Sequence, residues 1–123
     1  MDKKVILIAE DEIIPAYNLK LQLESLGYEV GEIIPNGEEI ILKAISGKPD
    51  LILMDIYLDN GINGIQAVKE IHVEKPNIPV IYITASNDKE TFNAIEETNY
   101  YKVIPKPYDF EVIKNAIENL FRM

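Results

Sequence analysis

The sequence predicts a single α/β domain, in which a doubly wound, five-stranded parallel sheet carries helices on both faces. Three observations lead to this fold class. Short apolar runs rich in β-branched residues alternate along the chain with segments of helical periodicity. The runs are nearly continuous, which is typical of strands buried on both faces. Finally, the 123 residues contain no linker, repeat or low-complexity tract, so we expect one domain over 1–123.

The first part of the chain is expected to form two strand–helix pairs. Val5–Ala9 predicts a strand because it is apolar and mostly β-branched. The helix that follows tolerates Pro15 in its first turn and stops at Gly27, with its apolar positions at Ile14, Tyr17, Leu19, Leu21, Leu23 and Leu26. Glu32–Pro35 is the second expected strand. The second helix ends at Gly47 and carries a stripe of Ile40, Ile41, Ala44 and Ile45.

Three further pairs complete the expected order. The strands are Leu51–Met54, Val80–Thr84 and Lys102–Pro105. The third helix carries a stripe of Ile65, Val68 and Ile71 and ends before Pro76. The fourth, Asp88–Thr98, has only a thin stripe, Phe92 and Ile95, so we expect it to dock least firmly. The fifth carries Ile113, Ala116, Ile117 and Leu120.

Composition excludes several classes of protein. The net charge of −9 and a pI near 4.5 argue against direct nucleic-acid binding, which needs a basic patch. There is no cysteine, so neither disulfides nor thiolate chemistry are expected, in keeping with a cytoplasmic location. No apolar stretch reaches the roughly 20 residues that span a bilayer. Acidic residues interrupt the N-terminal apolar run, so we expect no signal peptide and no membrane partner.

Polar residues follow the expected strands at their carboxyl ends. Glu10-Asp11-Glu12 follows the first, Asp55 the third, Thr84 the fourth and Lys106 the fifth. In a parallel sheet these ends share one edge, where ligands bind. Carboxylates are hard ligands suited to Mg²⁺, and a carboxylate beside a metal can accept a phosphoryl group. Singly, each residue has an ordinary explanation as a helix cap, a turn residue or a solvated lysine. Together they favour a phosphoryl-transfer site.

Four motifs, "ILIAEDE", "LILMDIYLDNGINGI", "PVIYITA" and "IPKPY", give the chain a clear resemblance to the receiver domains of two-component response regulators. The resemblance covers essentially the whole chain and implies a flavodoxin-like fold. It implies that Asp55 is the phosphoacceptor, and that Thr84 and Lys106 contact the phosphoryl oxygens. By the same resemblance, Mg²⁺ is held directly by Asp11, Asp55 and the backbone carbonyl of Tyr57, and by Glu10 through a water molecule.

The resemblance also implies partners and a mode of signalling. Receiver domains take the phosphoryl group from a histidine kinase or a phosphotransfer protein and later lose it to water, so the domain is expected to be a signalling switch rather than an enzyme. Its fourth helix, fifth strand and fifth helix would form the face that responds, and on which a second receiver can dock. The peptide bond between Lys106 and Pro107 is expected to be cis.

The sequence departs from the family pattern in two places. The loop between Asp55 and Gly64 is one residue longer than usual, which bears on access to the site. Val103 stands where the family usually carries a switching aromatic residue; Tyr101 either takes over part of that role or packs at the strand edge. By resemblance, Tyr57 and Ser86 tune hydrolysis of the phosphoryl group, and a bulky Tyr57 predicts slow hydrolysis. The lone histidine, His72, is assigned no role and is expected on a polar, exposed helix face.

Three alternatives remain open at this point. The first is a receiver-like interaction module that works without phosphate, which Val103 keeps open. The second is a Mg²⁺-dependent phosphatase with an aspartyl nucleophile, although "DIY" lacks a second acid close to Asp55. The third is a flavin-binding module of the same fold, although the acidic "AEDE" would repel a flavin phosphate. The sequence contains no segment that we can assign to an output domain.

Overall fold

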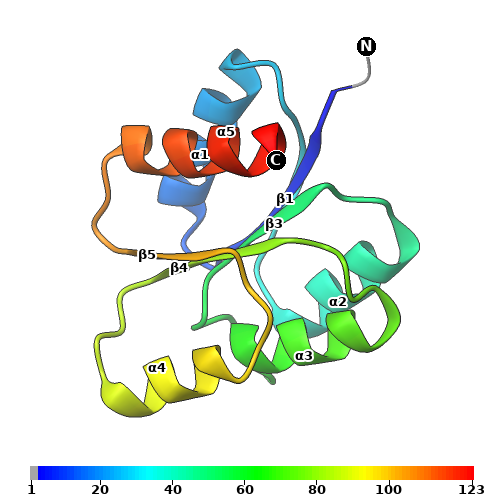
Figure 1. The fold of residues 1–123 in the computed structure, drawn as a ribbon, viewed down its shortest axis with the longest axis vertical. Coiled ribbons are helices and arrows are strands. Elements are labelled where there is room, and N and C mark those ends of the chain that lie inside the picture. Colours follow the sequence, from blue (N-terminus) through cyan, green and yellow to red (C-terminus); the bar gives the residue numbers. More distant parts are fainter. Residues whose placement is uncertain (1–2) are drawn as a thin grey trace.

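The structure, a computed structural model, describes residues 3–123. Five strands alternate with five helices in the predicted order (Figure 1). Their bounds are β1 Val5–Ala9, α1 Ile13–Ser25, β2 Glu29–Ile34, α2 Gly37–Ser46, β3 Leu51–Met54, α3 Gly64–Glu74, β4 Val80–Thr84, α4 Lys89–Glu96, β5 Lys102–Pro105 and α5 Phe110–Arg122.

All strand pairs are parallel, and the spatial order of the strands is β2-β1-β3-β4-β5. The chain moves outward from β1 to one edge, then returns to β3 and proceeds to the other edge. This reversal places the topological switch point between the carboxyl ends of β1 and β3, where ligands bind in open α/β sheets. The predicted doubly wound fold is therefore confirmed.

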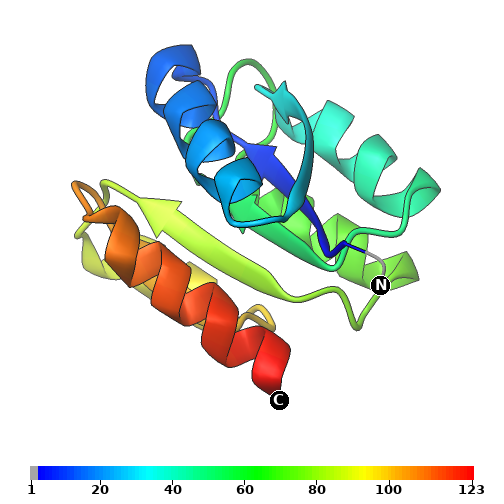
Figure 2. The same ribbon diagram turned by 90° about the horizontal axis from the view of Figure 1, so that it is seen from above.

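Two layers of helices enclose the sheet, with α1 and α5 on one face and α2, α3 and α4 on the other (Figures 1 and 2). Each face has its own apolar cluster. The central strand β3 is buried along its whole length, as its continuous apolar run predicts. Within residues 3–123, no helix is both long and apolar enough to cross a membrane.

Strand β2 begins earlier than predicted, at Glu29 instead of Glu32. Its first residues pair with β1, with Glu29 opposite Val5 and Val30 opposite Ile6. Only Val30 in this segment is buried, because β2 is an edge strand with one side open to solvent. The segment therefore lacks the continuous apolar run that predicted the other strands.

Helix α1 presents apolar side chains to solvent. Its buried residues are Ala16, Leu19 and Leu23. The other apolar positions of the predicted stripe are exposed, with exposed fractions of 83% for Ile14, 53% for Tyr17 and 48% for Leu21. Ile13 is exposed as well, at 70%. Apolar periodicity therefore located the helix but not the side that faces the core.

Two smaller expectations need correction. Helix α4 is shorter than predicted, because Asp88 is its N-cap and the helix ends at Glu96. Of its predicted stripe only Ile95 is buried, because Phe92 is 39% exposed, so the apolar stripe is even thinner than predicted. His72 is half-buried rather than exposed, and its Nε2 lies 2.9 Å from the carbonyl oxygen of Ile78, so it ties α3 to the segment before β4.

Candidate functional site

The backbone hydrogen bonds at the ends of the strands bring the predicted site residues together. The Asp55 amide donates to the Ala9 carbonyl at 3.0 Å, which sets Asp55 beside Glu10. The Lys106 amide donates to the Thr84 carbonyl at 2.9 Å. These bonds continue the strand pairing just beyond the end of each strand. The parallel sheet therefore gathers residues from four different segments of the chain at one edge.

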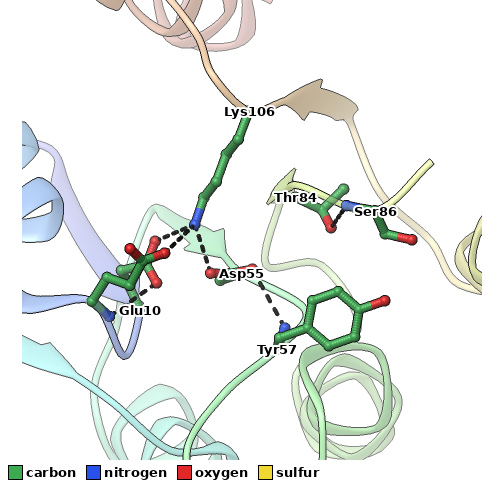
Figure 3. A network of polar contacts seen from close by, with 7 residues as sticks. Glu10, Asp55, Tyr57, Thr84, Ser86 and Lys106 are labelled. Carbon is green, nitrogen blue, oxygen red and sulfur yellow. Dashed lines mark hydrogen bonds and ion pairs between the residues drawn. The ribbon is translucent and has the colours of Figure 1, made fainter.

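Lys106 forms the centre of an ion-pair network. Its Nζ lies 2.6 Å from Oε1 of Glu10 and 2.8 Å from Oδ2 of Asp55. Figure 3 shows the lysine side chain reaching between these two carboxylates. Oε1 of Glu12 lies farther away, at 3.8 Å. Glu10 and Asp55 are buried, with 7% and 6% of their surfaces exposed, so the lysine compensates charge that solvent does not reach.

The network alters the titration of its members. Burial and the neighbouring Asp55 raise the pKa of Glu10 to about 7, against the lowering effect of Lys106. Burial alone would lower the pKa of Lys106, but its hydrogen bonds to Asp55 and Glu10 outweigh this effect and hold that pKa above its usual value. The site therefore holds more negative charge than its single lysine fully balances.

The acidic cluster has the donors expected for a hard divalent cation. Carboxylate oxygens of Glu10, Asp11 and Asp55 all lie within 4.8 Å of one another. Oxygen ligands, of which one or two are carboxylates, are what Mg²⁺ prefers. Asp55 adds to the effect of burial in raising the pKa of Glu10, and a cation here would relieve this repulsion between carboxylates. The residues present therefore fit Mg²⁺.

The loop after β3 is held close to the acceptor carboxylate. The Tyr57 amide lies 3.4 Å from Oδ1 of Asp55, and the Gly64 amide donates to the Ile56 carbonyl at 2.8 Å. A Cβ atom at Gly64 would overlap the carbonyl oxygen of Asp55, so only glycine permits this approach of α3 to the site. The longer loop is fixed at its other side by the Asp59 amide, which donates to the Pro35 carbonyl at 2.9 Å.

Thr84 links the site to the start of α4. It is buried, and its Oγ1 accepts from the Ser86 amide at 3.1 Å. The Ser86 hydroxyl donates to Oδ2 of Asp88 at 2.9 Å, and Asp88 caps α4 by accepting from the Thr91 amide. Figure 3 shows Thr84 and Tyr57 on the side of Asp55 away from Glu10. A change at Thr84 thus has a hydrogen-bonded route to α4.

A groove adjoins the charged network. It has a volume of about 460 Å³ and runs between α1 and the loop after β5, with Glu10, Glu12, Asn18, Lys106 and Tyr108 among its lining residues. Burial raises the pKa of Tyr108. On the outer side of α1, a second groove of about 440 Å³ is lined by the exposed apolar residues of that helix, namely Ile13, Ile14, Pro15, Tyr17 and Leu21.

Comparison with known proteins identifies the family. The family model of the response regulator receiver domain matches residues 6–118. The chain belongs to the response regulator receiver domain family. It is a receiver domain of the kind found in two-component response regulators, a signalling domain rather than a classical enzyme. The resemblance predicted from the four motifs is thereby confirmed.

Two curated relatives and one solved structure illustrate the similarity. The chain is 30% identical over 115 residues to the probable C4-dicarboxylate response regulator DctR of Bacillus subtilis, covering 94% of this chain and 50% of that protein. It is 36% identical over 119 residues to the response regulator ArlR of Staphylococcus saprophyticus, covering 95% of this chain and 52% of that protein. This receiver domain thus spans about half the length of these relatives.

The solved structure is that of the response regulator protein TrrA from Thermotoga maritima in complex with Mg²⁺ and BeF. It is 30% identical, has a TM-score of 0.83, and the match covers 95% of this chain and 98% of that one.

The receiver domain has the predicted site residues at one edge of its sheet, and the bond between Lys106 and Pro107 is cis, as expected.

Two features differ from expectation, namely the packing of Tyr101 and the position of Gly64. Tyr101 packs on the face covered by α1 and α5, so it cannot replace an aromatic switch beside α4. Val103 and Tyr100 pack on the α4 side. The proximity of Gly64 to the acceptor was not predicted, because it depends on the path of the loop.

Proposed function

We propose that this receiver domain accepts a phosphoryl group on Asp55 in a Mg²⁺-dependent reaction, and that residues 1–123 form one such domain. The observation that carries the proposal is the buried Asp55 carboxylate, with the Lys106 ammonium 2.8 Å away and two further carboxylates beside it. Burying adjacent carboxylates is costly unless cations compensate their charge, so this arrangement favours a site that binds a cation.

Each residue has a distinct part in the proposed reaction. An oxygen of Asp55 attacks the phosphorus atom of the donor, forming an O–P bond while the bond from phosphorus to the donor's nitrogen breaks and that nitrogen keeps the electron pair. Lys106 and the Thr84 hydroxyl stabilise the negative charge on the phosphoryl oxygens. Hydrolysis later transfers the group to water.

Bound Mg²⁺ would neutralise charge on the phosphoryl oxygens. Asp11, Asp55 and the backbone carbonyl of Tyr57 are proposed to hold it directly, and Glu10 through a water molecule. The carboxylate cluster and the pKa of Glu10 support this assignment. The complex of TrrA with Mg²⁺ and BeF supports it by similarity.

The proposed donor is a histidine kinase or a phosphotransfer protein. Receiver domains interact with such proteins. The exposed apolar side of α1 beside the site supports a macromolecular donor, because a small phosphodonor would not need a surface of this kind. The face formed by α4, β5 and α5 is proposed to respond to phosphorylation and to admit a second receiver. An acidic net charge of −9 supports a role without direct nucleic-acid binding.

The test is intact mass after incubation with acetyl phosphate and Mg²⁺. We expect the wild-type domain to gain one phosphoryl group, and we expect this gain to disappear with a chelator or in Asp55→Asn. Asp59→Asn, in the same loop, is the matched control and should be phosphorylated normally. A wild-type domain that gains no phosphoryl group from acetyl phosphate or from a phosphorylated donor protein would contradict the proposal and favour a phosphate-independent interaction module.

A further inference from the structure

Strand β4 is tied to α4 by a hydrogen bond between two side chains that the proposed phosphoryl chemistry does not use. Tyr82 is fully buried in β4, and its hydroxyl lies 3.0 Å from Oγ1 of Thr98, just beyond the end of α4. Thr98 donates its own hydroxyl hydrogen to the Ile95 carbonyl at 2.6 Å. Because a hydroxyl has a single hydrogen, Tyr82 must be the donor to Thr98.

The hydrogen bond joins the strand to the end of a weakly anchored helix. Helix α4 buries only Ile95, and it lies at the rim of the molecule, below β4 and β5 in Figure 1. Its ion pair between Lys69 and Glu97 is exposed, so it contributes little. The ring of Tyr82 also packs against Tyr100, which follows the helix, with ring centroids 5.9 Å apart. Beside the buried Ile95, Tyr82 therefore contributes a hydrogen bond and a ring contact that hold the C-terminal end of α4 to the sheet.

The place of Tyr82 in β4 connects this contact to the site. Thr84 lies two residues farther along the same strand and reaches the N-terminal end of α4 through Ser86 and Asp88. Both ends of α4 are thus attached to one strand, each by side-chain hydrogen bonds. In the neighbouring strand, Val103 is the register partner of Tyr82 and offers no hydroxyl or ring to this contact.

We propose that the hydrogen bond from Tyr82 to Thr98 is a latch that holds the C-terminal end of α4 on the sheet in the unphosphorylated domain, and that phosphorylation releases it. The release, though not the latch itself, rests on the proposed function. The latch couples β4 to α4 through Tyr82. Val103, its register partner in β5, makes no hydrogen bond of this kind because its side chain is aliphatic.

The test compares Tyr82→Phe with wild type by hydrogen exchange resolved to individual segments. Tyr82→Phe removes only the donor hydroxyl and keeps the buried ring. We expect amides near Ile95–Thr98 to exchange about threefold to tenfold faster, as the loss of one net hydrogen bond predicts, while amides in β3 keep their wild-type rates. Tyr101→Phe, the same change on the opposite face of the sheet, is the matched control and should leave α4 unchanged.

A second arm repeats the comparison with Mg²⁺ and beryllofluoride, a phosphoryl mimic. If phosphorylation releases the latch, the difference between Tyr82→Phe and wild type should largely disappear, and by linkage the variant should bind the mimic more tightly by the same factor. Equal exchange of α4 in the two unliganded proteins would overturn the latch, whatever the mimic does.

Two other outcomes are informative. A difference that persists unchanged in the mimic-bound proteins would make the hydrogen bond purely structural and overturn the release. A wild-type domain that binds no mimic would contradict the proposed function and the release with it, while the exchange of the unliganded proteins would still decide whether the latch exists.

Discussion

The Lys106 ammonium lies 2.8 Å from the Asp55 carboxylate, although the two residues follow strands that are not neighbours in the sheet. Strand β4 separates β3 from β5, and the lysine side chain reaches across its end (Figure 3). The same ammonium lies 2.6 Å from Glu10. One cation therefore compensates two buried carboxylates, and this arrangement makes the stability of the domain sensitive to the charge of its site.

Replacing Lys106 by Met should destabilise the domain in the absence of divalent cations. The variant leaves Glu10 and Asp55 adjacent and without their compensating charge, so we expect the free energy of unfolding to fall by about 3 kcal/mol, the lower end for a buried pair because Lys106 is partly exposed. Mg²⁺ should restore stability more in the variant than in wild type. Urea unfolding with and without Mg²⁺ measures both effects. Lys102→Met, which changes an exposed lysine of β5, is the control, and equal stabilities of the two variants would contradict the expectation.

Replacing Gly64 by Ala should damage both the fold and the site. The new methyl group would overlap the Asp55 carbonyl, so the start of α3 or the acceptor backbone must move. We expect a loss of about 2 kcal/mol or more in the free energy of unfolding, together with slower phosphorylation by acetyl phosphate. Gly31→Ala is the matched control, because a Cβ there has nothing within 4 Å. Gly64→Ala with the stability and rate of Gly31→Ala would show that the loop adapts freely.

Replacing Tyr57 by Asn should shorten the lifetime of the phosphorylated domain. The tyrosine stands beside Asp55, and we expect its bulk to hinder the water that attacks the phosphoryl group. The half-life of phosphorylated protein, followed by intact mass after removal of the donor, should be several-fold shorter in the variant. Tyr17→Asn alters a tyrosine with the same 53% exposure, on α1, and should not change the half-life. Identical half-lives of wild type and Tyr57→Asn would reject the idea.

Ionisation of Tyr82 should lower the stability of the domain at alkaline pH. Burial raises the pKa of Tyr82 from 10.0 to about 12. Between pH 10 and pH 12 the hydroxyl of Tyr82 has lost its proton in the unfolded chain and keeps it in the folded chain. The stability that Tyr82 contributes through this difference is therefore complete below pH 10 and decreases as the pH rises toward 12. The free energy of unfolding should therefore fall by about 1.4 kcal/mol per pH unit from this group.

Comparison with Tyr82→Phe isolates this effect from the titration of lysines and other tyrosines. Urea unfolding at a series of alkaline pH values should give a steeper decline for wild type than for the variant. Parallel declines would indicate that Tyr82 is not protected from ionisation in the folded domain.

Much of the architecture was predictable because it depends on local patterns. The strands β1, β3, β4 and β5 were predicted at their observed bounds, since each is a short, largely apolar run. The start of β2 was missed because an edge strand need not be apolar on both sides. The exposed side of α1 was not predictable, because its apolar residues surround the helix and periodicity alone does not choose between them.

The sequence by itself determined which chemical groups follow each strand, and this was enough to predict Glu10, Asp11, Asp55, Thr84 and Lys106 as the site. Only the tertiary structure decided that Lys106 bridges two carboxylates and that Tyr82 donates to Thr98. The physical reason is that strand order and side-chain partners arise from packing between segments far apart in the chain, whereas residue type and periodicity are local. The chemical groups of the site can therefore be predicted from the sequence, while the hydrogen bonds and ion pairs between them are decided by the fold.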